Sequence, residues 1–300
     1  MIVVVGEALV DLVPGGGDVL AAHLGGGPFN VARAVARLGG EVGFLGRLSE
    51  DRFGRALRAA LQDDGVDLRL AVATEDPTTL AIAEVDAAGV ARYVFYAAGT
   101  SVPGLMGVDV AAGAVAGASV LCVGSLGLVF EPVASTLEAL VAAAPSGQLV
   151  ACDPNCRPAA IGADAATYRA RLERVLARTD LMKASEEDLA FLRAGLDVEA
   201  AARDLLAGQG VALVTLGGEG ALVVSCDASR PSVPVAAPRV DVVDTIGAGD
   251  AFLGGFLSWW QARRLDRTDL TDAAALLAAT QEACAVAARA CTVAGASLPR

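Results

Sequence analysis

The stretch Asp244-Thr245-Ile246-Gly247-Ala248-Gly249-Asp250-Ala251-Phe252 combines a turn almost without side chains, one carboxylate and the start of a helix. Glycines allow backbone N–H groups to approach an anion, and the following helix directs the positive end of its dipole to the same point. Asp250 would lie in the first helical turn, within reach of a hydroxyl group. Phosphoryl transfer requires charge stabilisation, in-line positioning and such a proton acceptor. Taken alone, the stretch could equally be an ordinary N-cap turn in which Asp250 stabilises the helix.

A second glycine-rich stretch, Gly25-Gly26-Gly27-Pro28-Phe29-Asn30-Val31-Ala32, lies far upstream and is followed by Leu38-Gly39-Gly40. Three glycines leave room for a sugar against the backbone, and the amide of Asn30 can both donate to and accept from hydroxyl groups. The alternative for this segment alone is a loop ending in a Pro-started helix, with a solvated Asn30.

Both stretches resemble signatures of one family, the ribokinase-like (PfkB) carbohydrate kinases. Residues 244–257 are similar to its C-terminal signature and residues 25–40 to its N-terminal one, although the family usually has another glycine where Ser49 stands. The resemblance covers the full chain. It implies an α/β ribokinase-like three-layer fold, with a mostly parallel central sheet, helices on both faces and a small β-sheet lid. It also implies a kinase that uses ATP and Mg²⁺.

The resemblance further implies roles for particular residues. Asp250 is the expected catalytic base, and the amides of Gly247, Ala248 and Gly249 are the expected anion hole. The expected sugar-binding residues are Asp11, Gly26, Gly27, Asn30, Arg157 and Asp250. From the residues alone, Asp11 could either accept hydrogen bonds from two sugar hydroxyls or act structurally before the turn at Pro14-Gly15.

The run Asp153-Pro154-Asn155-Cys156-Arg157-Pro158 follows the end of an expected strand, where open α/β sheets bind ligands. Arg157 could clamp a phosphate or a substrate oxygen with its bidentate guanidinium. The run resembles the one found in fructokinases and 2-keto-3-deoxygluconate kinases. A turn stabilised by Asp153 and Asn155 is the alternative.

Further motifs concern the nucleotide and its ions. The run Thr215-Leu216-Gly217-Gly218-Glu219-Gly220 is similar to the ATP-contacting loop of the family, and a hairpin turn is the alternative. Ser185 and Asp188 stand where the family has an Asn-x-x-Glu motif that organises magnesium and phosphates, but helix capping also explains them. The expected nucleotide-binding residues are Ser185, Thr215, Gly217, Gly220, Gly247 and Gly249. Asp188 could act on Mg²⁺ through water, and Asp244 and Ile246 stand where family members often hold a monovalent cation, here potassium.

Composition limits the class of protein. Three hundred residues with 54% hydrophobic content can bury a large core, and the net charge of −12 argues against nucleic acid or an anionic membrane as a partner. One histidine, His23, and six cysteines without a Cys-x2-Cys pair make a zinc site improbable. No secretion signal is visible at the N-terminus, so we expect a cytoplasmic protein with reduced cysteines.

Short apolar runs alternate with helical segments. The expected strands are 2–5, 42–45, 120–123, 149–152, 181–182 and 211–215, and the expected helices include 51–62, 163–178 and 200–207. This alternation is typical of a mostly parallel sheet covered by helices, here in one domain over residues 1–300. The runs 80–85 and 91–96 flank a turn at 86–89 and predict an antiparallel hairpin. Together with 9–24, the segment 80–97 would form the lid, which by resemblance could also join two copies into a homodimer. The uncharged run 110–130 is expected to break at its glycines into a short helix, a buried strand and a loop.

The leading hypothesis is an ATP-dependent sugar kinase. The chain has no P-loop, and Gly247-Ala248-Gly249 lacks the later glycine of a dinucleotide fingerprint. Similarity to bacterial fructokinases favours fructose as the acceptor; 2-keto-3-deoxygluconate is the first alternative, and ribose or a nucleoside the next. A catalytically silent regulator that binds sugar or nucleotide is the non-kinase alternative, but it would be expected to have lost Asp250 or the glycine turn.

Overall fold

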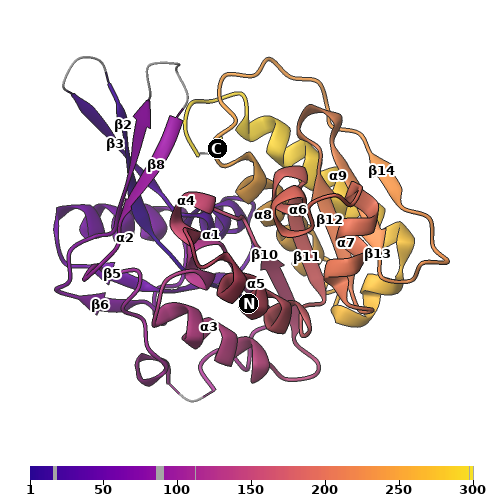
Figure 1. Ribbon diagram of the computed structural model, residues 1–300, viewed down its shortest axis with the longest axis horizontal. Coiled ribbons are helices and arrows are strands. Elements are labelled where there is room, and N and C mark those ends of the chain that lie inside the picture. Colours follow the sequence, from indigo (N-terminus) through magenta and orange to yellow (C-terminus); the bar gives the residue numbers. More distant parts are fainter. Residues whose placement is uncertain (16–18, 86–90, 112, 297, 300) are drawn as a thin grey trace.

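A central sheet organises the fold. The computed structural model describes residues 1–15, 19–85, 91–111, 113–296 and 298–299. Its main sheet has eight strands in the order β14-β13-β12-β11-β10-β9-β1-β4 (Figure 1). Strands β12 to β4 in this order run parallel, whereas β13 and β14 are antiparallel additions at one edge. The bounds are β1 Ile2–Val5, β4 Val42–Leu45, β9 Val120–Gly124, β10 Leu149–Asp153, β11 Leu181–Ser185, β12 Val211–Thr215, β13 Ala221–Ser225 and β14 Val233–Val235.

Helices cover both faces of this sheet. Successive side chains of a strand point to opposite faces, so Ile2 and Val4 pack in one core and Val3 and Val5 in the other. The first core is closed by α1 (Gly27–Arg37), α2 (Arg52–Asp64), α8 (Ala248–Ala262) and α9 (Ala273–Ala290). The second is closed by α3 (Val133–Ala142), α5 (Ala165–Leu176), α6 (Glu186–Leu192) and α7 (Val198–Leu206), next to the short α4 (Pro158–Ile161). The expected three-layer fold is confirmed.

A second, smaller sheet stands apart from the main one, as Figure 1 shows for β2, β3 and β8. Its order is β3-β2-β7-β8, with antiparallel pairs β2–β3 and β7–β8 and a parallel pair β2–β7. We call it the lid sheet; its bounds are β2 Leu9–Pro14, β3 Leu20–Gly25, β7 Leu80–Val85 and β8 Ala91–Tyr96. The predicted hairpin is confirmed in its strands, and its turn at 86–89 lies outside the described residues. A parallel pair, β5 (Arg47–Ser49) and β6 (Val72–Thr74), lies separately.

The expected elements agree with the observed ones except around residues 110–118. There the structure has a short 3-10 helix, η1 (Gly107–Asp109), and then turns in place of the expected short helix. Gly113 has a positive φ of 76°, which interrupts a right-handed helix. The other 3-10 helices are η2 (Ser125–Leu128), η3 (Gly217–Glu219) and η4 (Arg267–Thr271). In the described part of the chain, no helix combines the length and apolarity needed to cross a membrane.

Candidate active site

Polar residues, two of them predicted site residues (Ser185 and Thr215), lie at the carboxyl edge of the parallel strands. Asp153 is the last residue of β10, Ser185 of β11 and Thr215 of β12, and Ser125 directly follows β9. Because parallel strands end at the same edge, these residues lie side by side, and this is the edge where open α/β sheets bind ligands.

A hydrogen bond joins the two glycine motifs. Asn30, in the first turn of α1, donates from Nδ2 to Oδ2 of Asp250, in the first turn of α8, at 2.8 Å. The Oδ1 atom of Asn30 is buried and has no partner among the residues that the structure describes. Two segments 220 positions apart therefore meet at one carboxylate, beside an amide oxygen that can still accept a hydrogen bond.

The pKa of the Asp250 carboxyl is unusually high for an aspartate. Its side chain is buried, and burial raises the pKa of the carboxyl from 3.8 to about 7. The hydrogen bond from Asn30 and the charges of Lys183 and Arg157 lower this pKa, while Asp153 raises it. A carboxylate with a pKa near neutrality is suited to take a proton from an alcohol and release it later.

The turn before Asp250 exposes backbone donors at the start of a long helix. Gly247 is the N-cap of α8, in a left-handed conformation with φ 76°, and no side chain caps the helix. Gly247, Ala248 and Gly249, the predicted anion hole, thus lie at a helix N-terminus without a side-chain cap, although the amide of Ala248 donates to the carbonyl oxygen of Thr245 at 3.2 Å. Asp244 shapes the approach to this turn: its two carboxylate oxygens accept hydrogen bonds from the amides of Ile246, at 3.0 Å, and Gly295, at 2.8 Å.

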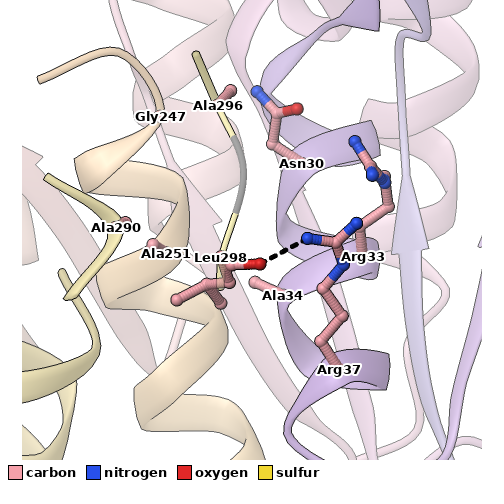
Figure 2. Close-up of a pocket in the computed structure, with 9 residues that line it drawn as sticks. All are labelled: Asn30, Arg33, Ala34, Arg37, Gly247, Ala251, Ala290, Ala296 and Leu298. Carbon is pink, nitrogen blue, oxygen red and sulfur yellow. Dashed lines mark hydrogen bonds between the residues drawn. The ribbon is translucent and has the colours of Figure 1, made fainter. Parts of the chain in front are cut away.

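The C-terminal segment packs against this turn. A side chain at Gly247 would clash with Ala296, whose Cβ would be only 2.6 Å away. Figure 2 shows the pocket between α1 and α8 at this point, where Nη1 of Arg37 donates to the carbonyl oxygen of Leu298. Helix α1 therefore holds both Asn30 and, through Arg37, the segment that restricts Gly247.

The glycines of the first motif are required by close packing. Gly26 has φ 110°, and a Cβ there would be 2.7 Å from the carbonyl oxygen of Glu7. The carboxylate of Glu7 accepts hydrogen bonds from the amides of Gly27, at 3.2 Å, and Gly127, at 3.1 Å. Glu7 is fully buried, and burial raises the pKa of its carboxyl. This carboxylate fixes the backbone at the start of α1, where the sugar is expected to lie.

Asp11 reaches the same region from the lid sheet. It pairs across β2 and β3 with His23, and a side chain at Gly25 would overlap its Oδ2 atom. Partial burial raises the pKa of the Asp11 carboxyl, and the charges of Arg157 and His23 oppose that rise. Arg157 itself is exposed and also acts electrostatically on Asp250. The structure thus brings Asp11, Arg157 and Asp250 into one electrostatic neighbourhood.

Ser125 and Asn155 lie next to Gly27 and have unusual backbone conformations. Ser125 and Asn155 have positive φ angles of 54° and 39°, which are uncommon for residues other than glycine and tend to occur at functional sites. A Cβ at Gly27 would lie 3.2 Å from Nδ2 of Asn155 and 3.4 Å from Oγ of Ser125. The ends of β9 and β10 therefore present polar side chains to the glycine motif.

The expected nucleotide residues form a second group along the same edge. Ser185 and Thr215 are directly paired between β11 and β12. The hairpin turn given as the alternative for residues 215–220 is present, since β12 and β13 are antiparallel and η3 closes the turn; contact of this turn with ATP stays a prediction. Gly217 and Gly220 have φ angles of 56° and 108°, and a Cβ at Gly217 would meet open space. The backbone of this turn at Gly217 is therefore accessible to a ligand, because no side chain covers it.

Both carboxylate oxygens of Asp188 accept hydrogen bonds from other groups of the protein. Its Oδ2 atom accepts hydrogen bonds from the amide and the hydroxyl of Ser185, both at 2.8 Å, and its Oδ1 atom accepts from the amide of Cys156 at 2.6 Å. The capping alternative for Ser185 and Asp188 is therefore present in the structure. Asp188 also ties the loop that carries Arg157 to the start of α6. Among the described residues, no group of three or more His, Cys, Asp or Glu side chains could hold a metal ion.

Lys183 and Glu7 were not among the predicted site residues. Lys183, whose Nζ atom lies 2.9 Å from Oδ2 of Asp153, and Glu7 are both buried charged residues in or beside strands. A lone lysine within an apolar strand was the signal that could have indicated Lys183, because lysine is almost never buried without a partner.

Known proteins resemble this chain in sequence and in fold. Residues 1–300 match the family model described as pfkB family carbohydrate kinase. A fructokinase from Rhizobium leguminosarum bv. trifolii is 35% identical over 271 residues, which are 86% of this chain and 79% of the relative. The crystal structure of a fructokinase from Xylella fastidiosa with bound ATP has a TM-score of 0.89 and 29% identity, covering 98% of this chain and 93% of that one. A double mutant of the fructokinase from Vibrio cholerae O395, with bound fructose, ADP and a potassium ion, has a TM-score of 0.84 and 29% identity over 98% and 93% of the two chains.

Proposed function

Because the chain belongs to the pfkB family of carbohydrate kinases and is an ATP-dependent sugar kinase, we propose that fructose is the sugar it phosphorylates. The observation that carries the proposed site is the hydrogen bond between Asn30 and Asp250. It unites the glycine-lined acceptor region with a buried carboxylate whose pKa is about 7.

In the proposed mechanism, the acceptor hydroxyl lies against Asp250. Asp250 accepts the hydroxyl proton as the oxygen attacks the γ-phosphoryl of ATP, and the bond between that phosphorus and the bridging oxygen to ADP breaks. The amides of Gly247 and Gly249, together with that of Ala248, which also donates to the carbonyl oxygen of Thr245, stabilise the charge on the transferred group from the N-terminus of α8. Asn30 orients the carboxylate throughout.

The sugar is held from three sides in this proposal. Asp11 accepts hydrogen bonds from its hydroxyls on the lid side, and Gly26 and Gly27 let it approach the backbone that Glu7 fixes. The guanidinium of Arg157 contacts the sugar on the third side. Fructose is favoured over the other acceptors by the similarity to fructokinases, one of which has a structure with fructose bound.

We assign the nucleotide to Ser185, Thr215, Gly217 and Gly220, with Gly247 and Gly249 at its terminal phosphate. Mg²⁺ is generally held by substrate phosphates, a few carboxylates and waters. Both oxygens of Asp188 already accept hydrogen bonds, so this residue suits an indirect, water-mediated contact with the ion. For potassium, each oxygen of Asp244 keeps a second lone pair, and the carbonyl of Ile246 lies in the same turn.

The proposal extends to assembly and location. We propose one domain over residues 1–300 and a homodimer through the lid sheet, on which Leu20 and Tyr96 are 48% and 56% exposed. Burial of this face between two copies would remove apolar area from water. The use of ATP fits a cytoplasmic enzyme. Sedimentation of the purified chain at several concentrations tests the dimer.

A panel of acceptors tests the choice of fructose. The rate of ADP formation is measured with ATP, Mg²⁺ and fructose, 2-keto-3-deoxygluconate, ribose or a nucleoside, and kcat/KM is compared. We expect the highest kcat/KM with fructose. A higher value with any other acceptor would show that the substrate was assigned wrongly, while leaving the kinase chemistry in place.

The keto acid is the second candidate for one structural reason. Arg157 carries the positive charge that acts on Asp11 and Asp250, and a guanidinium is well suited to bind a substrate carboxylate. The variant Arg157→Gln separates the two candidates. It should weaken binding of the keto acid far more than binding of fructose.

A further inference from the structure

The only lysine of the chain lies buried beneath the candidate anion hole. Lys183, on β11, is 4% exposed, and its Nζ atom is 2.9 Å from Oδ2 of Asp153 at the end of β10. A Cβ added to Gly249 would be 2.8 Å from the same Nζ atom. The ammonium group therefore lies directly against the turn whose amides are proposed to hold the transferred phosphoryl group.

This ion pair is incompletely satisfied. Asp153 is buried, and its Oδ1 atom has no hydrogen-bond partner in the part of the chain that the structure describes. A small cavity at this point has a mostly apolar lining, to which Ser125, Asp153, Asn155 and Asp250 contribute the polar side chains. Burying a charged pair costs free energy, and replacement of such pairs by apolar residues is often neutral or stabilising. Stability alone therefore does not account for charges at this position.

We propose that the Lys183–Asp153 ion pair is a positioning device of the active site, in which Lys183 supplies a fixed positive charge beside Gly249 and Asp250, and Asp153 holds that ammonium in place. The proposal rests on the role assigned to Asp250. It is independent of which sugar is the acceptor.

Lys183 and Asp153 have opposite effects on the pKa of Asp250. Burial lowers the pKa of Lys183, but the charges of Asp153, Asp188 and Asp250 raise it above its usual value, so the ammonium stays charged. At Asp250, where burial dominates, Lys183 lowers the pKa and Asp153 raises it. The titratable and charged groups that act on Asp250 from the elements around it are Lys183 on β11, Asp153 on β10, Arg157 in the loop after β10 and Cys122 on β9.

The test is the pH dependence of kcat/KM. Its acidic limb reports the pKa of the essential base in the free enzyme. Lys183→Met should move this limb to higher pH by about one unit, and Asp153→Asn should move it to lower pH by a similar amount. The double variant Lys183→Met/Asp153→Asn should return the limb close to that of the wild type. At a pH above all of these limbs, its kcat should still be lower by about a hundredfold, because the positive charge at the anion hole is missing.

A control distinguishes this role from a purely structural one. Lys183→Met alone leaves a buried acid unpaired and could prevent folding, whereas the double variant removes both charges and keeps similar volumes. Arg267→Met removes a partner of the buried acid Asp180, which precedes β11 at the opposite edge of the sheet. This control should lower stability without moving the limb.

Shifts of the two single variants in the same direction, or no shift, would overturn the proposal. So would a double variant with wild-type kcat at high pH. Failure of the proposed function itself is recognised separately, because the wild-type enzyme would then lack turnover with fructose or the Asp250→Asn variant would keep it.

Discussion

Replacing Asp250 by Asn should stabilise the ligand-free protein, and the gain should grow as the pH rises. The unfolded chain ionises this carboxyl near 3.8, whereas burial raises the pKa to about 7 in the folded state. Above the unfolded value, the folded state binds a proton that the unfolded state does not. The free energy of unfolding therefore falls with increasing pH until the folded pKa is passed.

The size of the effect follows from the linkage relation. Between about pH 5.5 and about pH 8, this one group should lower the free energy of unfolding of the wild type by about 2 kcal/mol, at 1.36 kcal/mol per pH unit up to the folded pKa. The Asn side chain carries no proton to lose and can still accept the hydrogen bond from Asn30. The difference in stability between variant and wild type should therefore widen by that amount.

Urea unfolding at the two pH values, without sugar or nucleotide, measures this difference. Asp63→Asn, at an exposed position of α2, is a matched control for the loss of one negative charge and should show a constant difference. A difference for Asp250→Asn that stays constant or narrows with pH would show that burial does not raise the pKa of the Asp250 carboxyl.

Two further variants test the framework of the site. Glu7→Ala leaves the amides of Gly27 and Gly127 without their acceptor and should lower the free energy of unfolding by about 2–5 kcal/mol, which denaturant titration measures; an unchanged midpoint would contradict its role. Asn30→Ala removes the donor to Asp250 and should move the acidic limb of kcat/KM to higher pH by about one unit, since that hydrogen bond favours the ionised form. A shift to lower pH would be inconsistent with the observed bond.

The parts of the site that rest on the backbone could be predicted from the sequence. Glycine turns such as Gly247–Gly249 and Gly25–Gly27 mark backbone without side chains, and the residues that follow each turn are placed by local chain geometry. The parallel strands of the main sheet were also predictable, because they are apolar on both faces, as Val3 and Val4 of β1 show.

The parts that depend on pairing between strands could not be predicted. Lys183 finds Asp153 because β10 and β11 are neighbours in a register that pairs Cys152 with Met182, and no local pattern shows this register. The sequence also gave no reason to expect that Asp188 would bond to the amide of Cys156, 32 positions away. That contact turns a residue expected near magnesium into one that fixes the Arg157 loop.

The most direct test of Asp250 as the catalytic base is the turnover of Asp250→Asn with fructose and ATP, measured beside the affinity for each ligand by calorimetry. We expect kcat to fall by about two to four powers of ten, the usual contribution of a general base, while both affinities stay near those of the wild type. Turnover close to that of the wild type, in a variant that binds both ligands, would show that Asp250 is not the catalytic base.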